Sequence, residues 1–351
     1  MSELLAGLER DAISAGDPAG MLGDVVAQPN QLGDALWRVE AAGITRRDLT
    51  GGLVVCGMGG SAIGGDLAAA ILGDRATRPI RTVRGYGLDP WTGADSLVLC
   101  ASYSGDTEEV LACFEAAGVI GAPRVALATG GALAEAARAE GVPVIGVPSG
   151  MQPRASVLYV TVAALECAAL CGAAPGLHTE LDAAAALLAE LTAAWGPESR
   201  DDSLAKSLAR ELHATIPVIH GADPTLAPAR RWKTQINENA KLPAFSSALP
   251  EANHNEICAW EAGRRTTPLS GVFLADPDQH PRIGRRMELN ARALEEAGAP
   301  VVRANSRGET RLERVLSLVL LGDLVSVYMA ILVGSDPSPV DAIERFKSAL
   351  G

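Results

Sequence analysis

Two short segments carry the residue types that bind a phosphate group. Residues 57–65 read GMGGSAIGG, and residues 102–109 read SYSGDTEE. Glycines let the backbone turn sharply and approach a ligand closely, while serine and threonine hydroxyls donate hydrogen bonds. Each segment precedes a predicted helix, whose first N–H groups attract anions. The candidate phosphate ligands are Gly59, Gly60, Ser61, Ser102, Ser104 and Thr107.

The first segment has two other interpretations. Gly57, Gly59 and Ala62 also fit a dinucleotide-binding fingerprint. The next predicted strand, however, ends near Arg84 and Gly85 rather than in the acidic residue that would bind a ribose. A glycine turn that serves only the packing of helix on strand is the second alternative.

The second segment favours the phosphate interpretation. A helix-capping box accounts for Thr107 with Glu109 nearby, but not for Ser102 and Ser104 as well. Dinucleotide folds do not need such a cluster of hydroxyls. Both segments follow predicted strands, so they can converge on one anion at the carboxyl edge of a parallel sheet.

The elements that position these loops alternate between strand and helix, which predicts parallel sheets covered on both faces. The pattern restarts after residue 213, so we expect an α/β fold with two doubly wound parallel-sheet subdomains, each with three αβα layers. The predicted strands lie at 51–57, 78–86, 96–105, 124–130 and 142–150, and then at 216–223, 244–251, 271–277 and 300–306.

The order of elements predicts five parts along the chain. Helices are expected to start at Asp17-Pro18 and at Asp34. The parts are an N-terminal helical segment at 1–50, a first subdomain with the phosphate loops at 51–172, linking helices at 173–212, a second subdomain at 213–335 and a C-terminal helix at 336–351.

Composition narrows the functional classes. The 351 residues carry a net charge of −12, which disfavours binding to nucleic acid or to an anionic membrane. The N-terminus lacks an apolar signal core, and no run approaches the roughly 20 apolar residues that span a bilayer. The six cysteines form no C-x-x-C pair, and four of them lie in apolar runs that favour buried, reduced thiols. We therefore expect a cytoplasmic protein.

With these motifs the chain resembles the sugar isomerase (SIS) fold, and as a whole the bifunctional phosphoglucose/phosphomannose isomerase family. The two loops carry the first half of the resemblance. Arg154, in the segment MQPRA, matches the arginine that faces the sugar phosphate site in the family. In the second half, QINENAK and LPEANHNEI match the family's catalytic segments. The loops are shared with many proteins that are not isomerases, so the second-half segments are the specific part.

The resemblance implies an aldose–ketose isomerase that works on a hexose 6-phosphate without a metal or other cofactor. Glu238 would be the base that moves a proton between C2 and C1, and His254 would act at the ring oxygen. Lys347 would be a second ring-opening group, and Arg154 would stabilise the enediolate. In related dimers the histidine that matches His254 comes from the partner chain, so the resemblance also implies a homodimer.

Each of these residues also has a plainer interpretation. Glu238 lies among basic residues and could belong to a solvated helix face, while His254 lies between two asparagines that suit a polar turn. Lys347 alone would be read as a surface lysine, and His220 as structural. A sugar-phosphate-binding regulator with this fold and no chemistry therefore remains the alternative. The histidines at 178, 213, 220, 254 and 280 are too scattered to indicate a zinc site.

Two further points concern specificity and affinity. Glucose and mannose phosphates lose their difference at C2 once the enediol forms, which is the basis of dual specificity in the family. The family loop commonly reads S-G-N-T, whereas this chain has Asp106 at the third position. A carboxylate there would oppose phosphate binding by about 1 kcal/mol. We expect Asp106 instead to point at the backbone, as a turn residue does.

Overall fold

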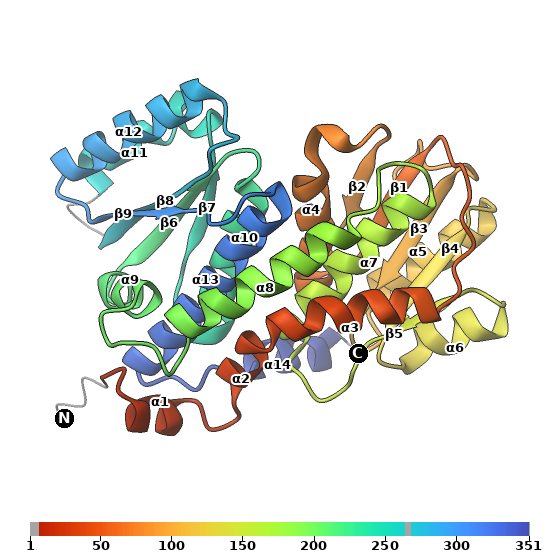
Figure 1. The fold of residues 1–351 in the computed structure, drawn as a ribbon, viewed down its shortest axis with the longest axis horizontal. Coiled ribbons are helices and arrows are strands. Elements are labelled where there is room, and N and C mark those ends of the chain that lie inside the picture. Colours follow the sequence, from red (N-terminus) through yellow and green to blue (C-terminus); the bar gives the residue numbers. More distant parts are fainter. Residues whose placement is uncertain (1–6, 264–267, 351) are drawn as a thin grey trace. The chain divides into compact units, whose positions relative to one another are not determined.

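The computed structural model describes residues 7–263 and 268–350. They form two compact units, each with its own parallel sheet (Figure 1). The first-sheet unit comprises Ala27–Ala189 and Arg307–Leu316. The second-sheet unit comprises Met1–Val26, Glu190–Ser306 and Ser317–Gly351.

The first sheet is entirely parallel, with the strand order β2-β1-β3-β4-β5. Its strands are β1 (Gly52–Cys56), β2 (Ile80–Val83), β3 (Ser96–Ala101), β4 (Arg124–Ala128) and β5 (Val144–Gly146). β1 pairs with β2 on one side and with β3 on the other, so the chain reverses its direction of winding there. In open α/β sheets, ligands bind at the carboxyl ends of the strands at such a switch point.

Helices cover both faces of the first sheet. α4 and α7 pack on one face of β1, and α5 and α6 on the other face of β3 and β4. Strand residues of even number, such as Val54 and Cys100, pack against α5 and α6. The helices are α3 (Gln28–Ala41), α4 (Gly59–Leu72), α5 (Glu108–Val119), α6 (Gly131–Ala139), α7 (Val157–Leu170) and α8 (His178–Trp195), whose last residues belong to the second-sheet unit.

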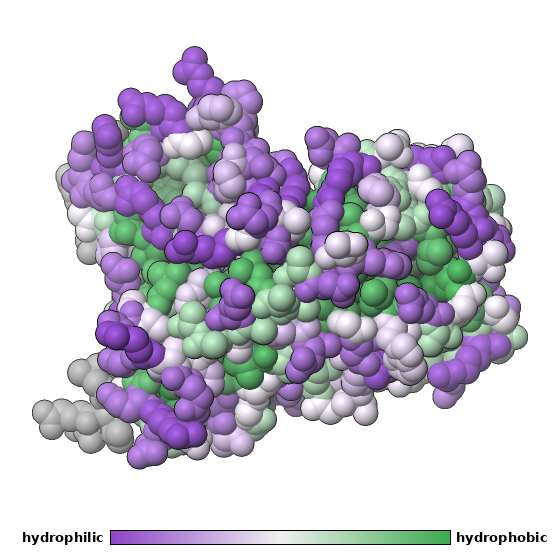
Figure 2. All heavy atoms as spheres, viewed as in Figure 1, coloured by the Kyte–Doolittle hydropathy of each residue, from purple (hydrophilic) through white to green (hydrophobic). Residues whose placement is uncertain are grey.

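The second sheet has the order β7-β6-β8-β9 and is also parallel. Its strands are β6 (Ile216–Gly221), β7 (Phe245–Ala248), β8 (Leu269–Ala275) and β9 (Val301–Asn305). α10 packs on β6 and β7, whereas α12 packs on β8 and β9 and presents a hydrophilic outer face (Figure 2). The remaining helices are α1 (Arg10–Gly16), α2 (Met21–Val26), α9 (Leu204–Leu212), α10 (Leu226–Gln235), α11 (Ile257–Gly263), α12 (Pro281–Glu296), α13 (Arg311–Leu332) and α14 (Asp341–Leu350).

The predicted fold class is confirmed, since both halves are parallel α/β units. The helix start predicted at Asp17-Pro18 lies too early, since α2 begins at Met21, but the carboxylate of Asp17 does accept hydrogen bonds from the N–H groups of Met21 and Leu22. The other, at Asp34, is wrong. Asp34 lies inside α3. Its carboxylate accepts hydrogen bonds from Arg38, one turn later, and from Tyr159 of α7, so Asp34 does not cap the helix.

The expectation that no run approaches the length of a membrane span fails for two helices. The segment Pro153–Leu170 and α13 are long and apolar enough to cross a membrane, by length and composition. The apolar windows are 83% and 94% buried within the protein, as in the core helices of a globular fold.

Candidate active site

The first predicted phosphate loop joins β1 to α4 at the switch point of the first sheet. α4 begins at Gly59, and the N–H groups of Ser61 and Ala62 turn back to the carbonyl of Met58. The N–H groups of Gly59 and Gly60 precede these bonds, at the positive end of the helix dipole. Gly59 has φ = 50°, a conformation that glycine adopts readily. The loop thus presents backbone donors in the arrangement that binds an anion.

The second loop joins β3 to α5, beside the first. The hydroxyl of Ser102 accepts a hydrogen bond from the N–H of Gly105 at 3.0 Å, and lies 2.8 Å from the hydroxyl of Thr107. Ser102 is only 2% exposed. Ser104 is exposed, and its hydroxyl accepts the N–H of Asp106 at 3.2 Å. Ser102 therefore shapes the loop, whereas Ser104 presents its hydroxyl to solvent.

Asp106 points at backbone, as expected. Its carboxylate accepts the N–H of Ala132 at 2.9 Å, in the first turn of α6. The negative charge is thereby held by the positive end of a neighbouring helix. Gly105 and Gly131, both with positive φ, allow the two turns to approach closely, since a Cβ on Gly105 would meet the carbonyl oxygen of Gly130.

Arg154 lies on a third segment, which contacts both loops. It belongs to a 3₁₀ turn, η2 (Pro153–Ser156), and is 3% exposed. A Cβ on Gly60 would lie 3.2 Å from the Cα of Arg154, so the turn packs directly on the start of α4. The Nη1 atom of Arg154 donates to Gln152 at 3.3 Å. The backbone therefore brings Arg154 to the first phosphate loop.

Tyr103 ties this third segment to the second loop, a role that the sequence analysis missed. Its hydroxyl donates to the carbonyl of Pro148 at 3.1 Å and accepts the N–H of Met151 at 3.0 Å. Its own carbonyl accepts the N–H of Thr129 at 2.9 Å. The position of Tyr103 between the two serines of the predicted loop was the signal in the sequence that could have indicated this role. The seven predicted phosphate and enediolate residues thus lie on three interlocked segments.

The predicted base, Glu238, lies in the second-sheet unit on a π-helical turn, η3 (Ile236–Ala240), at the end of α10. π-helical turns are rare and are found frequently at functional sites. α10 is fixed by an ion pair between Arg231 and Asp323, each 1% exposed, with two bonds of 2.8 and 2.7 Å. Trp232 donates to the carbonyl of Leu318 at 2.7 Å. Removing one partner of such a buried pair costs about 3–5 kcal/mol.

Glu238 lines a pocket of about 420 Å³ in the second-sheet unit. Asn237, Glu238 and Lys241 form one wall, and residues at the start of α14 form another, including Asp341 and Arg345. Lys347 lies on the same helix but does not line this pocket. The start of the C-terminal helix thus lines the pocket of the predicted base, and Arg345 rather than Lys347 is its basic residue there.

His254 ends a 3₁₀ turn, η4 (Glu251–His254), after β7. The turn is braced by a bond from Asn255 to Glu251 at 2.8 Å and by one from Ser247 to Glu256 at 2.5 Å. The side chain of His254 itself is exposed and does not line the pocket at Glu238. The loop is therefore well fixed, and the imidazole of His254 lies on the exposed surface of the chain.

The carboxyl edge of the second sheet is occupied by its own side chains. The hydroxyl of Thr225 donates to the carbonyl of Leu274 at 2.9 Å and accepts the amide of Gln279 at 3.0 Å. The carboxylate of Asp276 accepts the hydroxyl of Ser306 at 2.7 Å. These groups lie where the first sheet carries its phosphate loops, and a buried carboxylate there disfavours an anion.

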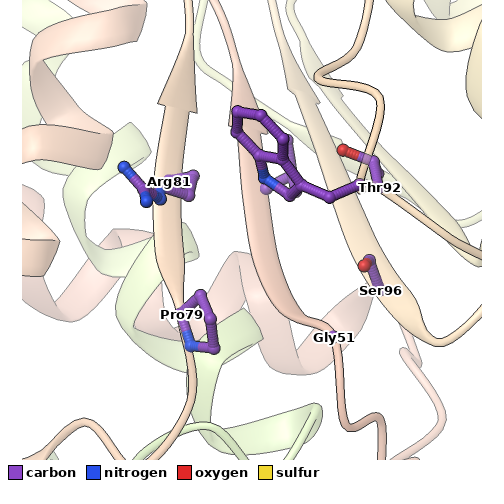
Figure 3. Close-up of a pocket in the computed structure, with 7 residues that line it drawn as sticks. Gly51, Pro79, Arg81, Thr92 and Ser96 are labelled. Carbon is purple, nitrogen blue, oxygen red and sulfur yellow. The ribbon is translucent and has the colours of Figure 1, made fainter.

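A pocket of about 320 Å³ lies at the opposite, amino edge of the first sheet (Figure 3). Pro79 and Arg81 lie along one side of it, and Thr92 and Ser96 along the other (Figure 3). It is remote from the carboxyl ends of the strands, where ligands bind in this fold. Among the described residues, no group of three or more histidine, cysteine or acidic side chains could hold a metal ion.

Comparison with known proteins identifies the chain's relatives. The model of the bacterial phospho-glucose isomerase C-terminal SIS domain matches residues 201–350. A bifunctional phosphoglucose/phosphomannose isomerase of Caldicellulosiruptor bescii is 36% identical, covering 85% of this chain and 89% of the relative. Its counterpart in Aquifex aeolicus is 37% identical, covering 87% and 92%. The crystal structure of a hypothetical protein from Thermus thermophilus has a TM-score of 0.74 at 17% identity, covering 97% and 92%.

Two parallel α/β units with hydroxyl-bearing loops at one switch point define a protein of the SIS fold. The chain belongs to the family of bifunctional phosphoglucose/phosphomannose isomerases. The resemblance predicted from the loops and from QINENAK and LPEANHNEI is confirmed.

Proposed function

We propose that this chain interconverts glucose 6-phosphate and fructose 6-phosphate, and also accepts mannose 6-phosphate, through a cis-enediol and without a metal. It is an enzyme of the isomerase class. The observation that carries the proposal is the meeting of three segments at the switch point of the first sheet, in a chain of this family. Backbone N–H groups of Gly59 and Gly60 and the hydroxyls of Ser61, Ser104 and Thr107 would hold the phosphate dianion.

The bound sugar must first open its ring. A base takes the proton of the anomeric hydroxyl, and an acid gives a proton to the ring oxygen as the C1–O5 bond breaks. We assign these two transfers to His254 and Lys347. Histidine suits them because its ordinary pKa lies near neutral pH.

The isomerisation then needs one carboxylate. Glu238 removes the proton from C2 of the open aldose, the electrons shift toward the carbonyl oxygen, and an enediolate forms. Arg154 stabilises the negative charge on that oxygen. A proton passes from the C2 hydroxyl to the C1 oxygen, and Glu238 returns the carbon-bound proton to C1, which yields the ketose with its carbonyl at C2. Because C2 is planar in the enediol, the glucose and mannose epimers share one intermediate.

A coupled assay with the three hexose phosphates tests the activity. Glu238→Gln should lower kcat by about 10²–10⁴-fold, the usual contribution of a general base. Glu288→Gln is the matched control, because Glu288 lies on the exposed face of α12, in an ion pair with Arg303. Turnover of none of the three sugars would refute the proposal. Thermal stabilisation by fructose 6-phosphate without turnover would instead identify a sugar-phosphate-binding regulator.

We also propose that the enzyme is a cytoplasmic homodimer in which His254 serves the partner's site. The exposed imidazole on a braced turn and the six free cysteines support this proposal. Mixing inactive Glu238→Gln and His254→Asn chains should restore up to about a quarter of the activity, since half of the dimers are mixed and each has one intact site. No recovery after exchange of subunits would argue against sharing.

A further inference from the structure

Lys241 directly follows the π-helical turn that carries Glu238. It has φ = 57°, and in the part of the chain that the structure describes it is the only residue other than glycine with a positive φ. The left-handed conformation crowds the Cβ of an L-residue, so helices that end this way usually have glycine or asparagine there. A lysine in this position indicates that its side chain is needed.

The ammonium of Lys241 bonds backbone carbonyls from two segments. It donates to the carbonyls of Glu238 at 2.8 Å and Asn239 at 3.2 Å, at the end of the π-helical turn. It also donates to those of Asp336 at 2.8 Å and Pro337 at 3.1 Å. An ammonium has three N–H donors, so the four carbonyls share them. A cation also suits the negative end of a helix dipole.

The second pair of carbonyls belongs to the turn that leads into α14. The N–H of Ser338 bonds the carboxylate of Asp336 at 2.9 Å, and Ser338 is 6% exposed, so this turn is ordered and packed. Behind the π-helical turn, Asn239 donates to the hydroxyl of Ser326 at 2.8 Å. Asn237 donates to the carbonyl of Leu242 at 2.8 Å. Lys241 thus joins the two walls of the pocket that Glu238 lines.

We propose that Lys241 is a positioning residue, which sets the place of the Glu238 carboxylate relative to α14. It acts through the backbone carbonyl of Glu238 and needs no contact with the sugar. This inference rests on the proposed role of Glu238 as the base. A displacement of about 1 Å at a reacting group can cost roughly 100-fold in rate, so a tether at the adjacent residue has a measurable effect.

Lys206 provides a comparison within the same unit. Its ammonium also donates to two backbone carbonyls, those of Pro197 at 3.2 Å and Ser199 at 2.9 Å, and the residue is 3% exposed. It lies on α9 and does not line the pocket at Glu238. Lys206→Met should therefore lower stability and leave kcat unchanged.

The test uses the full-length chain with three substitutions at position 241. Lys241→Gly fits the left-handed backbone but removes the ammonium, so it separates strain from tethering. It should keep the melting temperature of the parent and lower kcat by about 10–100-fold, with KM within about 3-fold. Lys241→Met should lose activity similarly, and Lys241→Arg should retain more of it. Parental kcat in Lys241→Gly and Lys241→Met, with Glu238→Gln inactive, would overturn the inference and leave the proposed function standing.

Hydrogen–deuterium exchange gives a readout that does not depend on activity. Amides of residues 336–350 should exchange faster in Lys241→Gly and Lys241→Met than in the parent or in Lys206→Met. Unchanged exchange there would overturn the tether even if the parent turned over no hexose phosphate. Failure of the proposed function would show instead as an inactive parent, whatever the exchange rates.

Discussion

The hydroxyl oxygens of Ser102 and Thr107 lie 2.8 Å apart, so two residues that we expected to hold phosphate are bonded to each other. Ser102 also accepts the N–H of Gly105. Part of the hydroxyl cluster therefore serves to shape the loop that presents Ser104.

Ser102→Ala should destabilise the chain and weaken substrate binding together. The change leaves the buried N–H of Gly105 without its acceptor, which costs about 1–3 kcal/mol. KM should rise for all three hexose phosphates. Ser104→Ala is the contrast, because its hydroxyl is exposed: KM should rise while the melting temperature holds. Equal melting temperatures for the two variants would contradict the structural role of Ser102.

Gly60→Ala should impair phosphate binding more than folding. The added methyl would lie 3.2 Å from the Cα of Arg154 and 3.3 Å from the carbonyl oxygen of Pro153, and backbone atoms cannot move aside cheaply. We expect KM to rise by about 10-fold, since a contact of roughly 1.4 kcal/mol is lost. Gly33→Ala is the control, because a methyl there meets no atom within 4 Å. A parental KM for Gly60→Ala would show that the two segments separate freely.

His220 should make the fold less stable in acid. Its ring stacks on Phe273 with centroids 4.6 Å apart, is 1% exposed, and neither ring nitrogen has a hydrogen-bond partner. Burial lowers its pKa to about 4, below the ordinary 6.5. The unfolded chain therefore takes up the proton first, and stability falls as the pH drops from 6.5 toward 4, by up to about 3 kcal/mol. His220→Phe should flatten this part of the curve in urea unfolding; an unchanged slope would contradict it.

His178 should act in the opposite direction. Its Nε2 lies 3.0 Å from the carboxylate of Glu166, a residue that is 7% exposed, and this hydrogen bond raises the pKa of His178. The stabilisation is fully present below pH 6.5, the ordinary value, and is lost as the pH rises through the raised pKa. The melting temperature of the parent should therefore fall relative to that of His178→Gln above pH 6.5. Parallel curves would show that the pair contributes nothing.

The sequence predicted most of the fold because its signals are local. Apolar strands followed by glycine-rich or serine-rich turns indicate parallel α/β units without long-range information. Asp34 was misplaced because an aspartate inside a helix looks like a cap until its partners Arg38 and Tyr159 are known. The division of the chain into five parts stays a prediction.

The residue types of the candidate site could be predicted from the sequence, but the hydrogen bonds that connect its segments could not. Short motifs indicated Ser104, Arg154 and Glu238, whereas the roles of Tyr103 and Lys241 depend on carbonyls far away in the sequence. Lys241, for example, bonds Asp336, 95 residues later. Every residue has a backbone carbonyl, so a hydrogen bond to one leaves no recognisable pattern of residue types in the sequence. The roles of Glu238, His254 and Lys347 therefore stay proposals that the assays above decide.

The polar groups at the carboxyl edge of the second sheet disfavour the binding of an anion there. Gln279 bonds Thr225, and Ser306 bonds Asp276, so polar groups at that edge already have hydrogen-bond partners within the protein. The candidate phosphate loops therefore lie in the first-sheet unit, whereas the second-sheet unit carries the proposed base, Glu238. The two sheets share the strand order around their first strand, and the same position in the winding carries phosphate-type loops in one unit and a self-bonded polar cluster in the other.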